Sequence, residues 1–308
     1  MKKISSLVYS IFIALFKITP FKFVICSILK KYNYKIDKYY TDLKFRGKFR
    51  VDVSNSENFY LFHHGGTIEN EIFWKGLFKS WESDTGWIWL ELARVSTNIV
   101  DIGANTGVYS MVAKAVNSSS NVFAFEPSNH TYNKLFKNNE INGFDIKCSQ
   151  IALSNVNGNQ IFYDTPDSNQ TSASLSSKKL KEWEGYNGQI IEYKIQTETL
   201  KSFFERNKLE SVDLIKIDIE MHEPEAIEGL GDDLLKLKPV IIIEVLSQNV
   251  ADQLNSLIDL TQFELFHLHS PGKAIKKEIF EVNQSLWNYL LFHKDKIDFI
   301  KQNTTVYN

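Results

Sequence analysis

A short glycine-containing loop after an apolar run is the feature that most constrains this fold. Residues 98–107 read Asn-Ile-Val-Asp-Ile-Gly-Ala-Asn-Thr-Gly, so a β-branched run stops at Gly103 and Gly107 precedes a helical pattern. Glycine accepts backbone angles that other residues resist, which lets the chain turn sharply and approach a ligand closely. Open α/β sheets bind nucleotides at the carboxyl ends of their strands. The loop therefore predicts a nucleotide-like ligand at such a sheet edge.

The spacing within this loop bears on which ligand it binds. The pattern is G-x-N-x-G and not the G-x-G-x-x-G of dinucleotide enzymes, so the phosphate-free cofactor S-adenosylmethionine competes with a nicotinamide cofactor. Glu126 ends the next apolar run, about 20 residues further on, where a carboxylate can accept both ribose hydroxyls. Alternatively, Glu126 stabilises the N-terminus of a helix opened by Pro127. The loop and the acid together favour ribose binding.

Apolar runs and helical patterns alternate through residues 96–308, which we expect to form the main domain. Such alternation predicts a mostly parallel sheet covered by helices on both faces. We expect the last two strands to pair as a hairpin. Residues 154–196 interrupt the alternation, and we expect a hairpin of 160–163 with 190–193 that carries a mobile loop with the Ser-rich run 172–177. The expected strands are 99–102, 122–125, 146–148, 214–217, 240–245, 263–268 and 287–292.

Two segments precede this domain. Residues 44–95 form a lead-in, with short strands over 44–64 and helix over 69–95. Residues 1–43 form a basic and apolar arm. Residues 1–50 hold twelve Lys and Arg residues, opposed only by Asp37 and Asp42. The apolar blocks of the arm, 7–16 and 21–29, are shorter than the roughly 20 residues that span a bilayer. The arm is therefore either an anchor at a membrane surface or a helical arm packed on its own domain or on a dimer partner.

Composition excludes several classes of partner and site. The net charge of −2 argues against broad capture of nucleic acid. Cys26 and Cys148 are too few for a disulfide framework or a cysteine zinc site. We expect a cytoplasmic protein, with peripheral association at the inner face of the membrane as an extension of that expectation. The sequence does not specify the oligomeric state.

A second acidic group follows the run 214–217. Asp218, Glu220 and His222 end this strand, and such groups can bind a polar substrate or take a proton from a hydroxyl. We expect these three residues to be catalytic, with Glu220 as the first choice of base. Alternatively, Asp218 only orients the ligand, or Asp218, Glu220 and Glu244 hold a divalent cation. We assign no metal site.

Six motifs follow one another along residues 80–292. They are 100–107 (VDIGANTG), 125–127 (FEP), 152–154 (ALS), 213–220 (DLIKIDIE), 239–244 (PVIIIE) and 288–290 (NYL). Together they resemble the FkbM family of S-adenosylmethionine-dependent methyltransferases. The resemblance implies the class I methyltransferase fold, an α/β architecture whose seven-stranded sheet has the order 3-2-1-4-5-7-6 with one antiparallel strand. It also implies S-adenosyl-L-methionine as cofactor and a hydroxyl of a sugar, glycan, glycolipid or polyketide as acceptor.

The resemblance also implies roles for individual residues. Glu126 holds the ribose, Ala152 lies near the adenine and Glu82 lines the cofactor. The family often has glycine where this chain has Met221, which predicts a more rigid loop. The residues that border the methionine part of the cofactor are Asp101, Gly103, Asn105 and Gly107.

We therefore expect an O-methyltransferase that acts on a sugar, glycan or glycolipid. Three other functions remain open at this point. One is a nicotinamide oxidoreductase, although Asn105 stands where a tighter glycine pattern is expected. Another is a glycosyltransferase that uses Asp218 and Glu220 as a metal-bound acidic pair. The third is a non-catalytic scaffold at a membrane that retains the methyltransferase fold, because a fold does not guarantee turnover.

Overall fold

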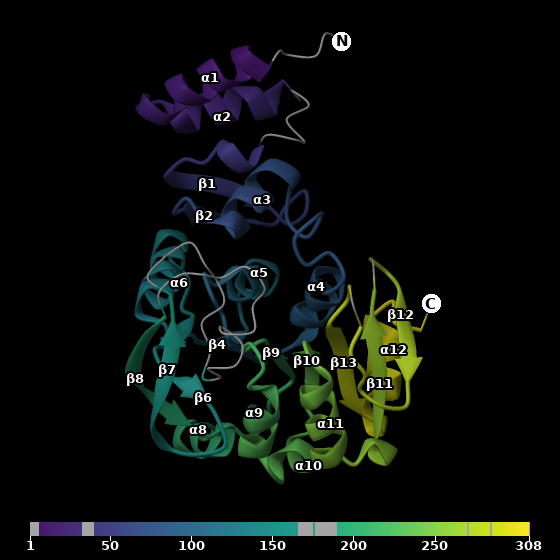
Figure 1. Ribbon diagram of the computed structural model, residues 1–308. Helices are drawn as coiled ribbons and strands as arrows, with labels where there is room; N and C mark the ends of the chain where they lie inside the picture. Colours follow the sequence, from purple (N-terminus) through teal and green to yellow (C-terminus); the bar gives the residue numbers. More distant parts are fainter. Residues whose placement is uncertain are drawn as a thin grey trace.

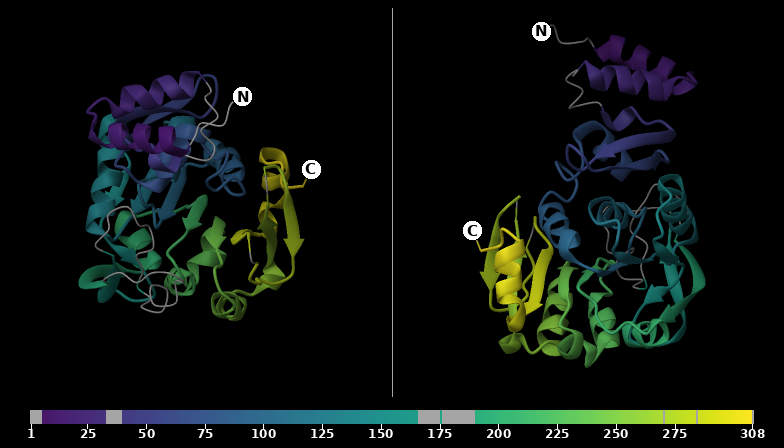
Figure 2. Two further views of the ribbon diagram at one scale, coloured as in Figure 1. Left: turned by 45° about the horizontal axis from the view of Figure 1, so that its top comes forward. Right: turned by 180° about the vertical axis from the view of Figure 1, so that it is seen from behind.

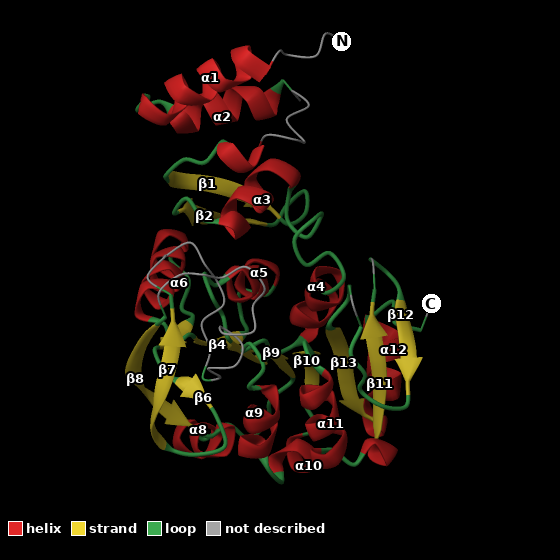
Figure 3. Ribbon diagram, in the orientation of Figure 1, coloured by secondary structure: helices red, strands yellow, loops and turns green. Residues whose placement is uncertain are grey.

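The computed structural model describes residues 6–32, 40–165, 175, 190–269, 271–283 and 285–307. Within these residues, the main sheet has eight strands (Figures 1 and 3). They are β3 (Asn98–Ile102), β4 (Asn121–Phe125), β5 (Lys147–Ser149), β9 (Leu214–Ile217), β10 (Val240–Glu244), β11 (Phe263–Leu268), β12 (Ala274–Lys277) and β13 (Asn288–His293). Their order across the sheet is β12-β11-β13-β10-β9-β3-β4-β5.

Seven of these strands confirm the order 3-2-1-4-5-7-6. The strands β5, β4, β3, β9 and β10 are parallel neighbours, and β13 runs antiparallel between β10 and β11. The predicted pairing of the last two runs is confirmed, but they are not a simple hairpin. The chain turns at Gly272, where φ is +77°, and returns as β12 along the outer edge of β11. This strand is an eighth, which the resemblance did not imply.

Two hydrophobic layers cover the sheet because successive strand residues point to opposite faces. On one face, Ile99 packs with the helices α4 (Gly86–Val95), α5 (Val108–Val116) and α6 (Asn129–Asn142). On the other, Val100 packs with the helices α8 (Leu200–Asn207), α9 (Glu223–Leu230) and α11 (Gln248–Leu257). Strands buried on both faces need continuous apolar runs, which is the pattern in the sequence. The short α10 (Asp233–Leu237) and the terminal α12 (Ile297–Asn303) complete the helices.

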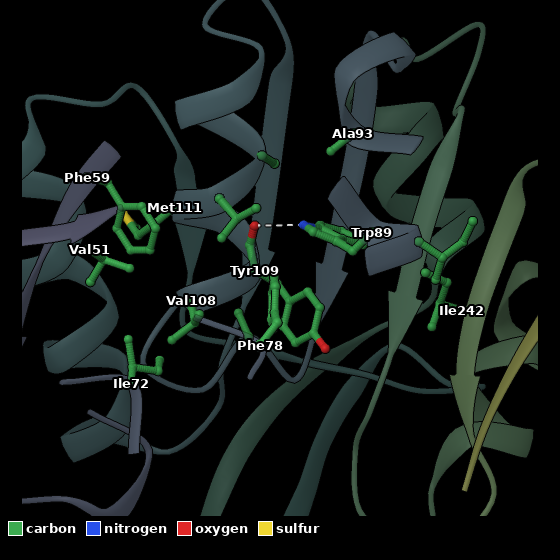
Figure 4. Packing of buried hydrophobic residues seen from close by; sticks show 14 of the residues in the cluster. Val51, Phe59, Ile72, Phe78, Trp89, Ala93, Val108, Tyr109, Met111 and Ile242 are labelled. Carbon is green, nitrogen blue, oxygen red and sulfur yellow. Dashed lines mark hydrogen bonds between the residues drawn. The ribbon is translucent and has the colours of Figure 1, made fainter. Parts of the chain in front are cut away.

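The helices α4 and α5 are joined by a buried contact. Figure 4 shows Trp89 of α4 beside Tyr109 of α5, with the indole Nε1 donating to the carbonyl oxygen of Tyr109 at 3.0 Å. Both side chains are buried, and their rings meet edge to face. The contact satisfies the indole N–H away from water, so it fixes α4 against the start of α5.

A separate three-stranded sheet lies beside β5. It contains β6 (Ala152–Leu153), β7 (Gly158–Asp164) and β8 (Ile191–Glu198), in the order β6-β8-β7. The predicted hairpin is confirmed, because Tyr163 pairs with Glu192 in antiparallel register. The loop that joins β7 to β8, with its Ser-rich run, lies outside the described residues except for residue 175.

The lead-in forms a small layer above α5 and α6. β1 (Gly47–Asp52) and β2 (Asn58–His63) pair antiparallel, and α3 (Thr67–Lys75) follows. The expectation of helix throughout 69–95 is wrong for 76–85. Gly76 ends α3 with a φ of +97°, and Phe78 and Glu82 also have positive φ, which a right-handed helix cannot contain. This break lets the chain pass the carboxyl ends of the parallel strands before α4 begins.

The arm forms two antiparallel helices at the end of the molecule farthest from the main sheet (Figure 2). They are α1 (Ser6–Ile18) and α2 (Lys22–Lys31). Cys26 of α2 is buried, and the rings of Phe23 and Phe45 lie 5.1 Å apart, so α2 packs on its own domain. Among the described helices, none has the length and apolar character needed to cross a membrane.

Candidate active site

A cavity of about 450 Å³ lies at the carboxyl ends of β3, β4, β9 and β10. Parallel strands present such a crevice where the strand order reverses, here between β3 and β9. The crossing segment before α4 contributes Trp81 to its wall, while Phe73 and Trp74 pack in the core. Eight of the ten residues predicted for the site line this cavity. They are Glu82, Gly103, Asn105, Glu126, Ala152, Asp218, Glu220 and His222.

Both glycines of the loop are required by its geometry. Gly103 has a φ of +78°, and a Cβ there would lie 1.8 Å from the carbonyl oxygen of Asp218. Gly107 has a φ of +86° at the start of α5, and a Cβ there would lie 2.5 Å from Leu135 Cδ1. A side chain at either position would collide with its neighbour in addition to straining the backbone. The loop therefore packs directly against the segment that follows β9.

Glu126 connects the loop to the end of β4. Its Oε2 accepts a hydrogen bond from the backbone N–H of Asn105 at 3.0 Å, and its Oε1 accepts one from Ser128 at 2.9 Å. Burial raises the pKa of Glu126 to about 8, although these N–H groups favour the charged form. A carboxylate oxygen can accept more than one hydrogen bond. Glu126 thus retains acceptor capacity toward the cavity while it holds the loop in place.

Asp101 and Gly107 lie behind the cavity wall and not in it. The Oδ2 of Asp101 accepts a hydrogen bond from the hydroxyl of Ser110 at 2.6 Å, so it ties β3 to α5. Burial raises the pKa of Asp101. Their observed contacts support the loop from behind.

A buried lysine that sequence reasoning missed neutralises part of the site. Lys216 lies in β9, is almost fully buried, and places its Nζ 2.5 Å from Asp218 Oδ2 and 3.9 Å from Glu82 Oε2. The same Nζ lies 4.4 Å from the centre of the Tyr109 ring. Burial alone would lower the pKa of Lys216, but the carboxylates of Asp218 and Glu82 raise it. Lys216 is therefore positively charged at neutral pH and lies among the residues that line the cavity.

The signal for Lys216 was present in the run Leu-Ile-Lys-Ile. A charged side chain in a run that must be buried needs a counter-charge nearby.

Two carboxyl groups of the cavity also have shifted pKa values. Burial raises the pKa of Glu82 to about 7, and the hydroxyl of Tyr109 donates to the Oε2 of Glu82. Burial and the neighbouring Asp218 and Glu220 raise the pKa of Glu244.

The segment after β9 has an unusual backbone held by one carboxylate. Glu220 and Met221 have φ values of +60° and +74°, the left-handed region that glycine favours. The fully buried Glu223 accepts hydrogen bonds at its Oε1 from the backbone N–H groups of Ile219 and Met221, at 3.0 and 3.3 Å. Met221 thus takes the conformation that glycine takes easily, and Glu223 stabilises that conformation.

The ring of His222 is fixed by two neighbours. Its Nε2 lies 3.0 Å from the hydroxyl oxygen of Ser154, and its Nδ1 lies 3.4 Å from Glu225 Oε2. Burial lowers the pKa of His222, so the ring is neutral at neutral pH. These contacts occupy both ring nitrogens at the edge of the cavity.

The arrangement of side chains also bears on the alternative of a divalent-cation site at Asp218, Glu220 and Glu244. Within the described residues, no group of three or more His, Cys, Asp or Glu side chains is placed to hold a metal ion. Asp218 is instead paired with Lys216.

Comparisons with known proteins point to one family. The methyltransferase FkbM domain matches residues 101–289, which is more than half of the chain. Methyltransferase sdnD of Sordaria araneosa is 25% identical over 200 residues, covering 57% of this chain and 77% of that protein. The hexuronic acid methyltransferase AglP of Haloferax volcanii is 24% identical over 161 residues, covering 52% of this chain and 61% of that protein.

A solved structure shares part of this architecture. The crystal structure of methyltransferase FkbM from Methylobacillus flagellatus KT aligns with a TM-score of 0.39 at 15% identity, over 64% of this chain and 44% of that chain. The present chain thus spans less than two thirds of AglP and less than half of that crystallised chain. The strand order of the main sheet, and not this score, identifies the fold.

Proposed function

The chain belongs to the FkbM methyltransferase family, and we propose that it methylates a hydroxyl group of a sugar, glycan or glycolipid. The observation that carries the proposal is that one cavity is lined by Glu126, by the glycine loop and by the acidic side chains of Asp218 and Glu220. A sugar acceptor is supported by the similarity to a hexuronic acid methyltransferase. Because the chain belongs to a methyltransferase family, we do not propose the glycosyltransferase alternative.

The cavity suits the cofactor of this family. S-adenosylmethionine supplies a methyl group bound to a positively charged sulfur. The carboxyl groups of Glu82, Asp218 and Glu244 line the cavity together with Lys216. Burial favours the neutral forms of Glu82 and Glu244, and a positively charged ligand beside them would favour their charged forms. Thr106 also lines the cavity, and its buried Oγ1 has no hydrogen-bond partner within the described residues. Such a buried polar atom is expected to meet a ligand or water.

We assign the ribose, adenine and methionine parts of the cofactor to different residues of the cavity lining. Glu126 would accept the ribose hydroxyls, and Ala152 of β6 would contact the adenine. Glu82, Gly103 and Asn105 would border the methionine end, with Asp101 and Gly107 supporting the loop from behind. Each contact uses a residue that lines the cavity or directly supports one that does.

Among the three candidate bases we keep Glu220 as the first choice. It lines the cavity at the start of the left-handed segment. Asp218 and His222 also line the cavity, where Asp218 pairs with Lys216 and the ring of His222 contacts Ser154 and Glu225. The carboxylate of Glu220 would take the hydroxyl proton of the acceptor as the new O–C bond forms and the bond from the methyl carbon to sulfur breaks, because an alcohol that keeps its proton is a weak nucleophile. The remaining residues hold the reacting atoms in line.

A mass-spectrometric assay tests the activity. The purified chain is incubated with isotopically labelled S-adenosylmethionine and a cell-envelope glycan extract, and we expect a labelled methyl ether on a sugar. A protein that binds S-adenosylhomocysteine but methylates no fraction of the extract would contradict a glycan acceptor and favour a non-catalytic scaffold.

Glu220→Gln tests the base. We expect kcat to fall by about 10²- to 10⁴-fold, the usual contribution of a general base, with unchanged affinity for S-adenosylhomocysteine. Isothermal titration and steady-state kinetics give the two quantities. Glu205→Gln, an exposed change on α8, is the matched control and should retain full turnover. Full turnover in Glu220→Gln would remove this residue from the base role.

A further inference from the structure

The helical arm exposes an apolar stripe on each of its two helices. In α1, Ile11, Leu15 and Ile18 are exposed at the spacing that places residues on one helix face. In α2, the exposed apolar residues recur from the turn before the helix to the residue after it. They are Phe21, Val24, Ile28 and Tyr32. Soluble proteins rarely leave such contiguous apolar surface to water, so these stripes indicate a binding surface.

The opposite sides of the same helices pack against the lead-in layer. Phe16 of α1 and Cys26 of α2 are buried in the core cluster, and the Nζ of Lys30 lies 4.7 Å from the centre of the Phe73 ring in α3. The arm is thus held on the lead-in layer by these sides, and its stripes are exposed with respect to the residues that the structure describes. Their exposure is large, with Ile18 at 80% and Phe21 at 66%.

The charge of the arm selects the partner. Residues 6–32 contain Lys17, Lys22, Lys30 and Lys31 and no acidic residue. A second copy docking arm to arm would bring together two basic surfaces that have no acidic residue to pair with, which is repulsive. A bilayer that contains anionic lipids attracts the lysines and accepts the apolar stripes between its head groups.

The arm is also linked to the cavity through one helix. The first turn of α3 contributes Thr67 and Ile68 to the cavity wall, and Phe73 of the same helix contacts Lys30 of the arm. In Figure 1, α3 lies between the arm helices and the main sheet. Because the first turn of α3 lines the cavity, a surface bound by the arm would lie on the other side of α3 from the cavity.

We propose that α1 and α2 form a docking surface for an anionic lipid bilayer, in which the two apolar stripes enter the head-group region and the exposed Lys17 and Lys31 contact lipid phosphates. The arm lies on the membrane and does not cross it. This inference goes beyond the methylation reaction and does not depend on the identity of the acceptor.

Vesicle co-sedimentation of the full chain tests the docking. We expect binding to vesicles of phosphatidylcholine with about one quarter phosphatidylglycerol, and much weaker binding to phosphatidylcholine alone. Binding should weaken as salt rises, because ions screen the lysines. Equal binding to both vesicles, or none to either, would overturn the proposal.

Two pairs of variants separate the contributions. Ile18→Ser with Phe21→Ser shortens the apolar stripes, and Leu235→Ser with Leu257→Ser is the control, because those exposed residues lie on α10 and α11. We expect the first pair to lower the partition coefficient at least about tenfold, since each buried apolar side chain contributes to partitioning. The control pair should bind as the unmodified chain does.

The charge variants follow the same design. Lys17→Glu with Lys31→Glu should lower binding to anionic vesicles at least about tenfold, and Lys137→Glu with Lys236→Glu changes the net charge equally away from the arm. Thermal melts and titration with S-adenosylhomocysteine verify that each variant is folded. If the arm variants instead abolish a concentration-dependent dimer and leave vesicle binding unchanged, the surface binds a second copy and the proposal is wrong. Retained cofactor binding in every variant keeps this result separate from the proposed reaction.

Discussion

Glu126→Gln tests whether the buried carboxyl at the end of β4 binds the cofactor in its charged form. The pKa of this group is raised to about 8 by burial, so at pH 6 it is protonated in the free protein. Ribose hydroxyls that donate to it favour the carboxylate, and binding below pH 8 must then release a proton. The affinity for S-adenosylhomocysteine should therefore rise with pH, by up to about tenfold per unit from pH 6 to pH 8.

The variant should lose this dependence. Glutamine does not titrate, and its amide nitrogen would face the backbone N–H of Asn105 or Ser128, where Glu126 now accepts hydrogen bonds. Charge-assisted hydrogen bonds contribute about 1.5–3 kcal/mol each. The loss of one or two such bonds from the ribose hydroxyls to residue 126 should therefore weaken binding about 10- to 100-fold or more at pH 8. The ratio of the variant's Kd to that of the unmodified protein should increase as pH rises toward 8.

Stability gives an independent readout of the same group. Because the folded-state pKa is raised from 4.5 to about 8, its contribution to stability is complete below pH 4.5 and is lost as pH rises through 8. The shift corresponds to about 5 kcal/mol at most. Relative to Glu126→Gln, the unmodified protein without cofactor should therefore become less stable between pH 5 and pH 9.

Isothermal titration at pH 6, 7, 8 and 9, with thermal melts at the same pH values, measures both effects. Glu140→Gln, a change of an exposed carboxyl group on α6, is the control and should follow the unmodified protein. Parallel curves of Kd against pH for Glu126→Gln and the unmodified protein would refute the reasoning.

Two further predictions concern stability and are measured by urea unfolding. Gly103→Ala places a Cβ 1.8 Å from the carbonyl oxygen of Asp218, and we expect a loss of about 3 kcal/mol or more. Gly143→Ala at a φ of +63° meets no atom within 4 Å and should lose only about 1 kcal/mol, so equal losses would contradict the close approach. Lys216→Met leaves Asp218 and Glu82 beside the cavity without their cation, and we expect a loss of about 3–5 kcal/mol. Lys236→Met, on the surface of α10, should change little, and a similar loss in both variants would show that the buried cation has no special role.

The main sheet could be predicted because its information is local. Each buried strand requires a continuous apolar run, and the glycines of the loop follow from the turn that ends β3. The edge strand of the sheet could not be predicted, because β12 is short, is half exposed and, within the described residues, pairs with β11 alone. The break at 76–85 was also missed, although Gly76 offered a signal for the end of α3.

The site was predicted as a set of positions but not as a network. Most of the predicted residues line one cavity, because strand ends that follow each other in the sheet converge in space. The pairing of Lys216 with Asp218 and the fixing of His222 by Ser154 join residues through side-chain geometry. Sequence spacing does not encode such geometry, since Ser154 and His222 are 68 positions apart.

The left-handed backbone at Glu220 and Met221 restricts how this segment can change during evolution. A residue other than glycine pays about 1–2 kcal/mol for such angles, and the two N–H groups held by Glu223 compensate for that strain. Loss of Glu223 should cost less stability once residue 221 is glycine, so we expect glycine at 221 to precede a replacement of Glu223. The identity of one side chain thereby sets which mutations are open to its neighbour.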